Sequence, residues 1–124
     1  MTDLTTVIDA WLEAYAEEDI ERRMKLIEQA WAPEGRLVDP PLEGEGYGGL
    51  SEAANLVNTH YAGHTFRRVS GIDTHHEFVR YGWELVGPDG NPVIAGIDVG
   101  ELAPDGRLRR VTGFFGDLPA LEAQ

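Results

Sequence analysis

Three stretches with helical spacing occupy the first half of the chain. Apolar side chains recur every three or four positions over residues 4–15 and again over residues 20–31, as on the buried faces of amphipathic helices. Asp19 is a suitable N-cap for the second stretch, and Pro33 ends it. A third apolar stripe covers residues 50–61. Because very few residues separate the first two helices, we expect these two to lie antiparallel.

From residue 64 onward the apolar pattern changes to a period of two, which predicts β-strands. Four strands are expected, over residues 66–73, 78–86, 93–102 and 107–116. Turn sequences separate them at residues 74–77, 87–92 and 103–106, so consecutive strands should pair antiparallel. Helices followed by such a sheet predict an α+β fold, and a length of 124 residues predicts one domain spanning residues 1–124.

Asp39 is the most unusual residue of the short strand that we expect over residues 36–41. It follows Leu37 and Val38 and precedes Pro40 and Pro41. An Asp-Pro pair commonly starts a turn. The same position also suits a carboxylate held at the mouth of an apolar cavity, and the strand alone leaves both interpretations open.

A second acid, Asp98, lies inside the apolar run of residues 93–102. An ionised carboxylate is costly to bury without partners, so such a group pairs, accepts hydrogen bonds or takes up a proton. Gly96 and Gly100 lie on the same predicted face and would leave room for a bound molecule. Both faces of this strand are largely apolar, which predicts a homodimer that covers the outer face of the sheet.

Charge and composition narrow the possible partners. The net charge is −12, with 22 acidic and 10 basic residues, so neither nucleic acid nor an anionic membrane is an expected partner. The chain has no cysteine, no apolar run long enough to span a membrane and no signal-peptide pattern, which predicts a cytoplasmic location. An apolar small molecule is the expected ligand.

A glycine-rich stretch over residues 42–49 is expected to be a flexible loop at the rim of the fold. Its two glutamates would repel phosphate, and it lacks the ending of a phosphate-binding loop. No cofactor is expected. His60 and His64 have the spacing of a metal-binding pair, but no third ligand accompanies them, so no metal site is predicted either.

Three segments carry a resemblance to a known family: Leu37-Val38-Asp39-Pro40, Ile97-Asp98, and the closing run from Asp105-Gly106-Arg107-Leu108 to Phe114-Phe115-Gly116-Asp117. With the helices before them, they resemble the nuclear-transport-factor-2-like superfamily over roughly residues 7–117. Within it, the chain is most similar to ketosteroid isomerases and SnoaL-type polyketide cyclases. The resemblance implies three helices packed on a strongly curved, mixed but mainly antiparallel sheet, which forms a cone with an internal pocket.

The resemblance also implies catalytic roles. Asp39 matches the general base that moves a proton between carbons next to a carbonyl. Asp98 matches the protonated acid that donates a hydrogen bond to the enolate oxygen. The family's oxyanion tyrosine falls on Trp11, whose indole N–H donates one hydrogen bond but cannot relay a proton; Tyr15 lies one helical turn later. The residues expected to line the pocket are Trp11, Tyr15, Trp31, Val57, His60, Val111, Gly113 and Phe115.

These residues fit an isomerase, a cyclase or a dehydratase that acts on an apolar, carbonyl-bearing substrate. A ligand-binding or assembly module of the same fold is the alternative, because this superfamily includes members that only bind. A second alternative is an epoxide hydrolase, which would require Arg80 to lie between two carboxylates.

Overall fold

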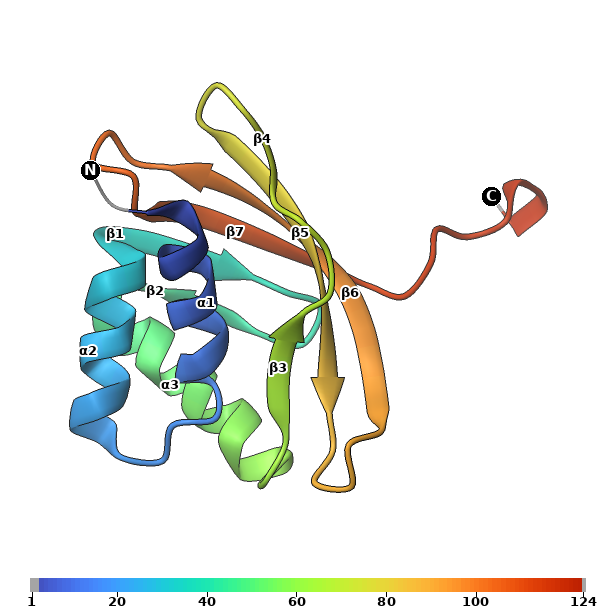
Figure 1. Cartoon of the computed structure of the whole chain (residues 1–124), viewed down its shortest axis with the longest axis horizontal. Helices are drawn as coiled ribbons and strands as arrows, with labels where there is room; N and C mark the ends of the chain where they lie inside the picture. Colours follow the sequence, from blue (N-terminus) through green and yellow to red (C-terminus); the bar gives the residue numbers. More distant parts are fainter. Residues whose placement is uncertain (1–2, 124) are drawn as a thin grey trace.

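The three predicted helices are present in the computed structural model of the chain, which describes residues 3–123. They are α1 (Leu4–Ala14), α2 (Ile20–Ala30) and α3 (Gly46–His60). The side chains of Asp3 and Asp19 accept hydrogen bonds from backbone N–H groups in the first turns of α1 and α2, which satisfies donors that a helix start leaves free. Figure 1 shows the three helices gathered on one side of the sheet.

A seven-stranded sheet forms the other layer, with β4 paired only to β5 beside the main path. The order along that path is β2-β1-β7-β6-β5-β3, in which β1 and β7 run parallel and all other neighbours run antiparallel. The predicted α+β class and the curved, mixed sheet are therefore confirmed. The strands are β1 (Trp31–Val38), β2 (Glu43–Glu45), β3 (Thr65–Arg68), β4 (Asp73–His75), β5 (Phe78–Val86), β6 (Pro92–Leu102) and β7 (Leu108–Phe115).

The stretch over residues 42–49 is ordered secondary structure, so its prediction as a flexible loop is wrong. Its first part is β2, which pairs with β1, and its second part is the first turn of α3. Gly46 has a φ of 70°, in the left-handed region that glycine tolerates, and lets the chain turn from the strand into the helix. A side chain at Gly44 would collide with the backbone of Gly49, so glycine there permits this close packing.

Two strand boundaries also differ from the prediction. The single strand expected over residues 66–73 is interrupted, and β3 and β4 pair with opposite ends of β5 while the segment between them leaves the ladder. The side-chain hydroxyl of Ser70, in that segment, accepts the N–H of Gly82 in β5 at 2.8 Å. The expected strand at Asp39 begins earlier, at Trp31, and ends at Val38, so Asp39 lies just beyond β1.

The main core lies between the helices and the concave face of the sheet. Trp11 of α1, Trp31 of β1 and Leu50 of α3 are fully buried there, together with Ile27 and Leu37. The Trp11 and Trp31 rings meet edge to face, with centroids 5.3 Å apart. This packing fills the space beside the start of β1, whereas the cavity described below is lined by residues of β3, β5 and β6 and of the turn after β1.

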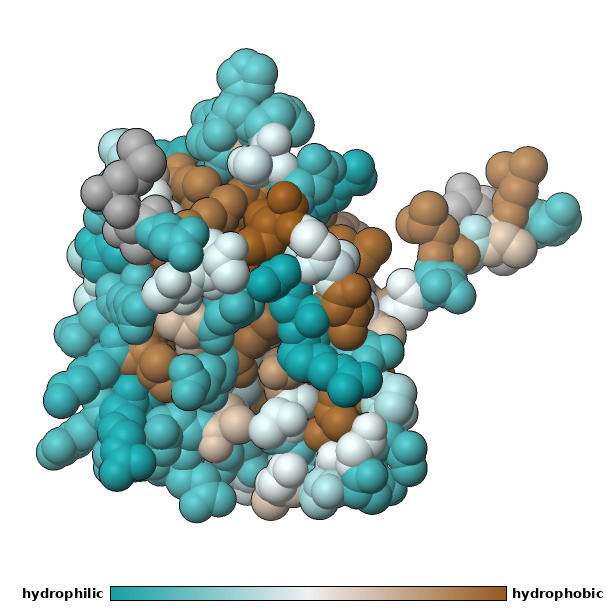
Figure 2. Space-filling view, in the orientation of Figure 1, coloured by the Kyte–Doolittle hydropathy of each residue, from teal (hydrophilic) through white to brown (hydrophobic). Residues whose placement is uncertain are grey.

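The convex face of the sheet is exposed in the single chain, although both faces of β6 were expected to be covered. Val93, Ile97 and Val99 of β6 and Phe114 of β7 have 41–59% of their surface exposed. Beyond β7 a tail leads to a short 3-10 helix, η1 (Leu121–Ala123), and Figure 2 shows apolar side chains on this tail, away from the body. Within residues 3–123, none of the helices is long and apolar enough to cross a membrane.

Candidate active site

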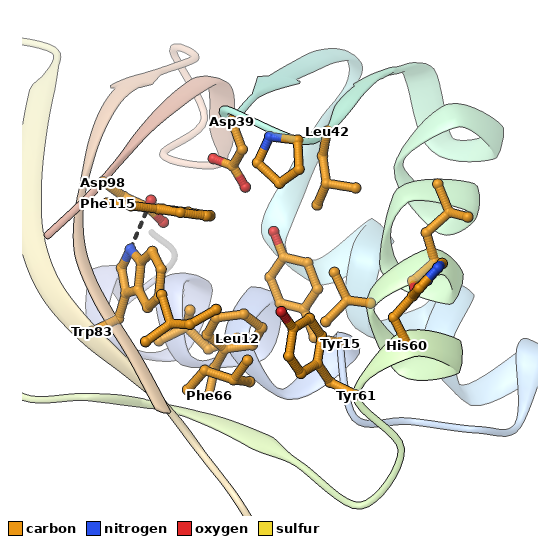
Figure 3. A pocket seen from close by; sticks show the side chains of 15 residues that line it. Leu12, Tyr15, Asp39, Leu42, His60, Tyr61, Phe66, Trp83, Asp98 and Phe115 are labelled. Atoms are coloured by element: carbon orange, nitrogen blue, oxygen red, sulfur yellow. Dashed lines mark hydrogen bonds between the residues drawn. The ribbon is translucent and has the colours of Figure 1, made fainter. Parts of the chain in front are cut away.

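One cavity of about 550 Å³ opens between α1, α3 and the β5–β6 part of the sheet, a size within the range of small-molecule pockets. Figure 3 shows the side chains that line it. Its aromatic lining consists of Tyr15, Tyr61, Phe66, Trp83 and Phe115. Its aliphatic lining includes Leu12, Leu42, Val57, Leu85 and Ile94. The ionisable side chains that reach this wall include Asp39, Asp98 and His60, and none of the described lining residues is Lys or Arg.

Asp39 reaches the cavity from a tight turn that follows β1. Its N–H donates to the carbonyl of Leu42 at 2.8 Å, and the N–H of Leu42 donates back to the carbonyl of Asp39 at 3.3 Å. Pro40 and Pro41 occupy the tip of this turn. Both interpretations of Asp39 therefore hold together, because its backbone makes the turn while its carboxylate lines the cavity.

One oxygen of the Asp39 carboxylate lacks a hydrogen-bond partner among the described residues. This atom, Oδ1, is buried. Burial raises the pKa of Asp39 to about 6, and the nearby backbone N–H of Gly113 offsets part of this rise. A carboxylate with a pKa this close to neutrality can both accept and release a proton under ordinary conditions, which is what a general base needs.

Asp98 lies on β6 and is 6% exposed. Its Oδ2 accepts the hydroxyl of Tyr81 at 2.9 Å, and its Oδ1 accepts the indole N–H of Trp83 at 3.0 Å. Burial raises the pKa of Asp98 to about 7, and the charge of Asp39 adds to the rise, while the two hydrogen bonds oppose it. Asp98 therefore changes charge near neutral pH.

Gly113 of β7 lies between the two acids. A Cβ atom at this position would overlap with Asp39 Oδ1 and would lie 3.1 Å from Asp98 Oδ1. The two carboxylates thus face the same small gap, and any larger residue at position 113 would push them apart. The sequence predicted that Gly113 would contact the ligand, but it is not among the residues that line the cavity; it sets the spacing of the two acids instead.

The other predicted pocket residues divide into two groups. Tyr15, Val57, His60 and Phe115 line the cavity together with the two acids. Trp11, Trp31 and Val111 do not line it, because they are fully buried or nearly so in the core.

Tyr15 is the C-cap residue of α1, four residues after Trp11, and its hydroxyl faces the acids. In Figure 3 its oxygen points towards the end of the cavity that holds Asp39. Its ring packs against Trp11 with centroids 4.5 Å apart. Burial raises the pKa of Tyr15 well above its ordinary value, the charges of Asp39 and Asp98 add to this, and the Trp11 indole partly opposes it. Tyr15 therefore stays protonated and has a proton to donate.

Arg80 is on the opposite side of the sheet from the cavity. Its side chain is 70% exposed and pairs with Asp73 of β4 at 2.8 Å. The epoxide-hydrolase alternative required Arg80 to lie between two carboxylates; because Arg80 is exposed and pairs with Asp73 alone among the described ion pairs, that alternative is contradicted.

Gly96 and Gly100 do not leave room for a ligand, contrary to the sequence-based interpretation. The space above Gly96 is filled by the indole of Trp83, and the space above Gly100 is filled by Val79. Sequence reasoning also missed Tyr81 and Trp83 as partners of Asp98. Their alternation with Val79 on one face of β5 was the available signal, but it predicted core packing alone.

Comparison with known proteins identifies the fold. No protein-family model and no curated protein matches the chain. Among solved structures, a cystatin-like-fold protein from Nostoc punctiforme has a TM-score of 0.72 at 14% identity, covering 94% of this chain and 91% of its own. A SnoaL-like protein from Jannaschia, provisionally classed as a polyketide cyclase, has a TM-score of 0.70 at 15% identity, covering 90% of this chain and 83% of its own.

These two likenesses show that the protein has the cystatin-like cone fold. A third solved structure is much more similar in sequence. It is a SnoaL-like family protein from Agrobacterium tumefaciens, provisionally classed as an isomerase, with 38% identity and a TM-score of 0.85. The match covers 94% of this chain and all of that one. The chain belongs to the SnoaL-like family.

Proposed function

We propose that this protein is a small-molecule enzyme that moves a proton next to a carbonyl group of an apolar substrate. An isomerase, a cyclase and a dehydratase all use this step. The observation that carries the proposal is the pair of carboxylates at one end of an otherwise apolar cavity, of which Asp39 has a buried oxygen with no partner among the described residues. The provisional classes of its solved relatives, isomerase and polyketide cyclase, agree with this chemistry.

In this proposal Asp39 is the general base. It removes the proton from the carbon beside the carbonyl and returns it to another carbon or releases it, according to the reaction. Negative charge then develops on the carbonyl oxygen, and Asp98 in its protonated form is the hydrogen-bond donor that stabilises it. Tyr15 is a second donor, because its hydroxyl faces the same end of the cavity and keeps its proton at neutral pH.

Isotope exchange tests this proposal directly. The protein is incubated in D2O with a panel of apolar cyclic ketones and enones, and binding is followed by tryptophan fluorescence. We expect at least one bound ketone to gain deuterium at the carbon beside its carbonyl, measured by mass spectrometry, because base-catalysed enolisation exchanges that hydrogen. A ketone without a hydrogen at that carbon is the control.

The opposite result would favour the ligand-binding alternative. If ketones bind in the cavity and quench tryptophan fluorescence, but none exchanges above the rate in buffer, the cavity holds ligands without turnover.

We also propose that the protein forms a homodimer through the convex face of the sheet. Cross-strand neighbours place Ile97 beside Phe114, and the next rows carry Arg80 and Glu101 on the same face. Arg80 pairs with Asp73 and Glu101 pairs with Arg109 within the chain, so these charges form a polar rim. An exposed apolar centre within a polar rim suits a second, two-fold related copy that covers the centre.

Light scattering checks the dimer. We expect the mass of two chains for the natural protein and of one chain for Ile97→Glu, since a charge in the centre of the interface would be buried without a partner. Ile20→Glu is the matched control, because Ile20 is equally apolar, 66% exposed and on α2. A single-chain mass for the natural protein at micromolar concentration would contradict the proposal.

A further inference from the structure

Trp83 makes an unusual contact for a residue of a core strand. It lies on β5 directly opposite Gly96 of β6, and its ring lies across β6 with its Nε1 atom at Asp98 Oδ1. Figure 3 shows this hydrogen bond between two residues that line the cavity. The ring also packs edge to face against Phe66 and Phe115, with centroids 5.2 and 5.5 Å away. Trp83 is therefore held in place on three sides.

Gly96 is what allows this position of the ring. A Cβ atom at residue 96 would lie 2.5 Å from Cζ2 and 2.9 Å from Cε2 of Trp83, well inside van der Waals contact. A Cβ atom there would also collide with the backbone carbonyl of Phe114 on β7, so any other residue at position 96 would disturb both the position of the indole N–H and the pairing of β6 with β7. The glycine and the tryptophan thus form one unit with the acid.

The chemistry of the two donors to Asp98 is not the same. An indole N–H can only donate, so Asp98 Oδ1 is an acceptor whether the acid is charged or neutral. The Tyr81 hydroxyl, at Oδ2, can donate to a carboxylate or accept from a carboxylic acid. The carbonyl oxygen of a carboxylic acid is a better acceptor than its protonated oxygen, so a neutral Asp98 keeps Oδ1 as the acceptor of the indole N–H and carries its proton on Oδ2. Tyr81 can still donate to Oδ2, which leaves the Oδ2 proton for a bound molecule.

We propose that Trp83, seated by Gly96, is a positioning residue that holds Asp98 Oδ1 as an acceptor and so confines the proton of this acid to Oδ2. The proposal concerns the same site as the proposed function, and it adds which atom of Asp98 carries the proton and which residue decides this. The role of Trp83 depends on the geometry of the site and not on turnover. Its test and the test of the proposed function can therefore fail independently.

The other groups around Asp98 do not supply an equivalent contact. Asp39 faces it from the turn after β1 and acts through its charge. Tyr15, directly after α1, and His60 of α3 line the same cavity, and their side chains make no hydrogen bond to Asp98 among the described contacts. The described cavity lining contains no Lys or Arg that could stabilise the charged form of Asp98. Loss of the indole N–H should therefore favour the neutral form of Asp98.

The first test uses the natural protein and needs no substitution. The chain has three tryptophans, so a nitrogen–proton spectrum has three indole signals to assign. We expect the Trp83 signal to move with pH at the same midpoint as the side-chain carboxyl carbon of Asp98, because the two share a hydrogen bond. The Trp31 indole, which is buried and has no partner among the described residues, should stay constant. A Trp83 signal that does not follow Asp98 would overturn the proposal.

The second test removes the N–H and keeps an aromatic ring. In Trp83→Phe we expect the carboxyl midpoint of Asp98 to rise by about one pH unit, the usual effect of losing one hydrogen bond to a charged group. Gly96→Ala should move the midpoint in the same direction, because it displaces the ring; it is the less specific of the two variants, since its methyl group would also collide with the Phe114 carbonyl of β7. Trp31→Phe is the matched control and should leave the midpoint unchanged.

An Asp98 midpoint that is equal in Trp83→Phe and Trp31→Phe would overturn the proposal. If Trp83→Phe does not fold, the pH titration of the natural protein decides the question alone. Where turnover is found, the limb of the kcat/KM profile on the alkaline side should shift upward in Trp83→Phe by the same amount, whereas a purely structural role would lower the rate at every pH.

Discussion

Asp39→Asn is expected to lower kcat about a thousandfold, the usual contribution of a positioned general base. The amide has nearly the shape of the carboxylate but cannot accept a proton, so the step at the carbon beside the carbonyl loses its base. Affinity for the ligand should change little, because most of the cavity wall is aromatic or aliphatic. Turnover and ligand binding, measured on the same ketone, separate the two effects.

Asp73→Asn is the matched control for this substitution. Asp73 pairs with Arg80 on the exposed surface of the sheet, so the same chemical change there should leave kcat unaltered. If Asp39→Asn keeps the natural rate, Asp39 is not the base. If it loses ligand binding together with turnover, its carboxylate contributes to binding, and the assignment to proton transfer is contradicted.

Asp98→Asn is expected to stabilise the protein at pH 8 by about 4 kcal/mol, and to have little effect at pH 4. In the unfolded chain an aspartate loses its proton near its ordinary pKa of 3.8, whereas burial raises the pKa of Asp98 in the folded state to about 7. Over this window the folded state holds a proton that the unfolded state has released. The contribution of Asp98 to stability therefore falls as pH rises from about 4 to about 7, and stays low above.

Denaturant unfolding at several pH values measures this effect. Asn at position 98 keeps an oxygen for the Trp83 N–H and removes the buried charge, so the difference in unfolding free energy should grow with pH. Asp73→Asn again serves as the control, because its carboxylate is exposed. A difference that is the same at pH 4 and pH 8 would show that Asp98 carries no unfavourable charge in the folded protein.

Local patterns were sufficient for most of the elements. The apolar stripes of α1 and α2 and the alternation along β5, β6 and β7 all correspond to observed elements, because each buries one face against the same core. The stretch at residues 42–49 was misread because glycine usually indicates flexibility. Here glycine serves close packing, since Gly44 touches the backbone of Gly49, and no local pattern distinguishes these two uses.

The two acids were also recognisable from the chain, since each is a carboxylate next to apolar residues. Their mutual position was not. Asp39 comes from a turn and Asp98 from a strand, and they meet only because β7 lies between β1 and β6 with Gly113 at the crossing point. The distinction between Tyr15, which reaches the cavity, and Trp11, which does not, likewise depends on how α1 packs against β1.

The chain therefore specifies its helices, its strands and the two carboxylates that mark the site through local periodicity and composition. The surroundings of Asp98 were decided by strand register. The hairpin pairs Val86 with Pro92, and unbroken pairing from there would place Tyr81 opposite Ile97, which faces outward. An irregularity between Leu85 and Val86 shifts the register by one residue, so that Tyr81 lies opposite Asp98. One extra residue in a strand exchanges its two faces, and only the packed sheet determines where it is accommodated.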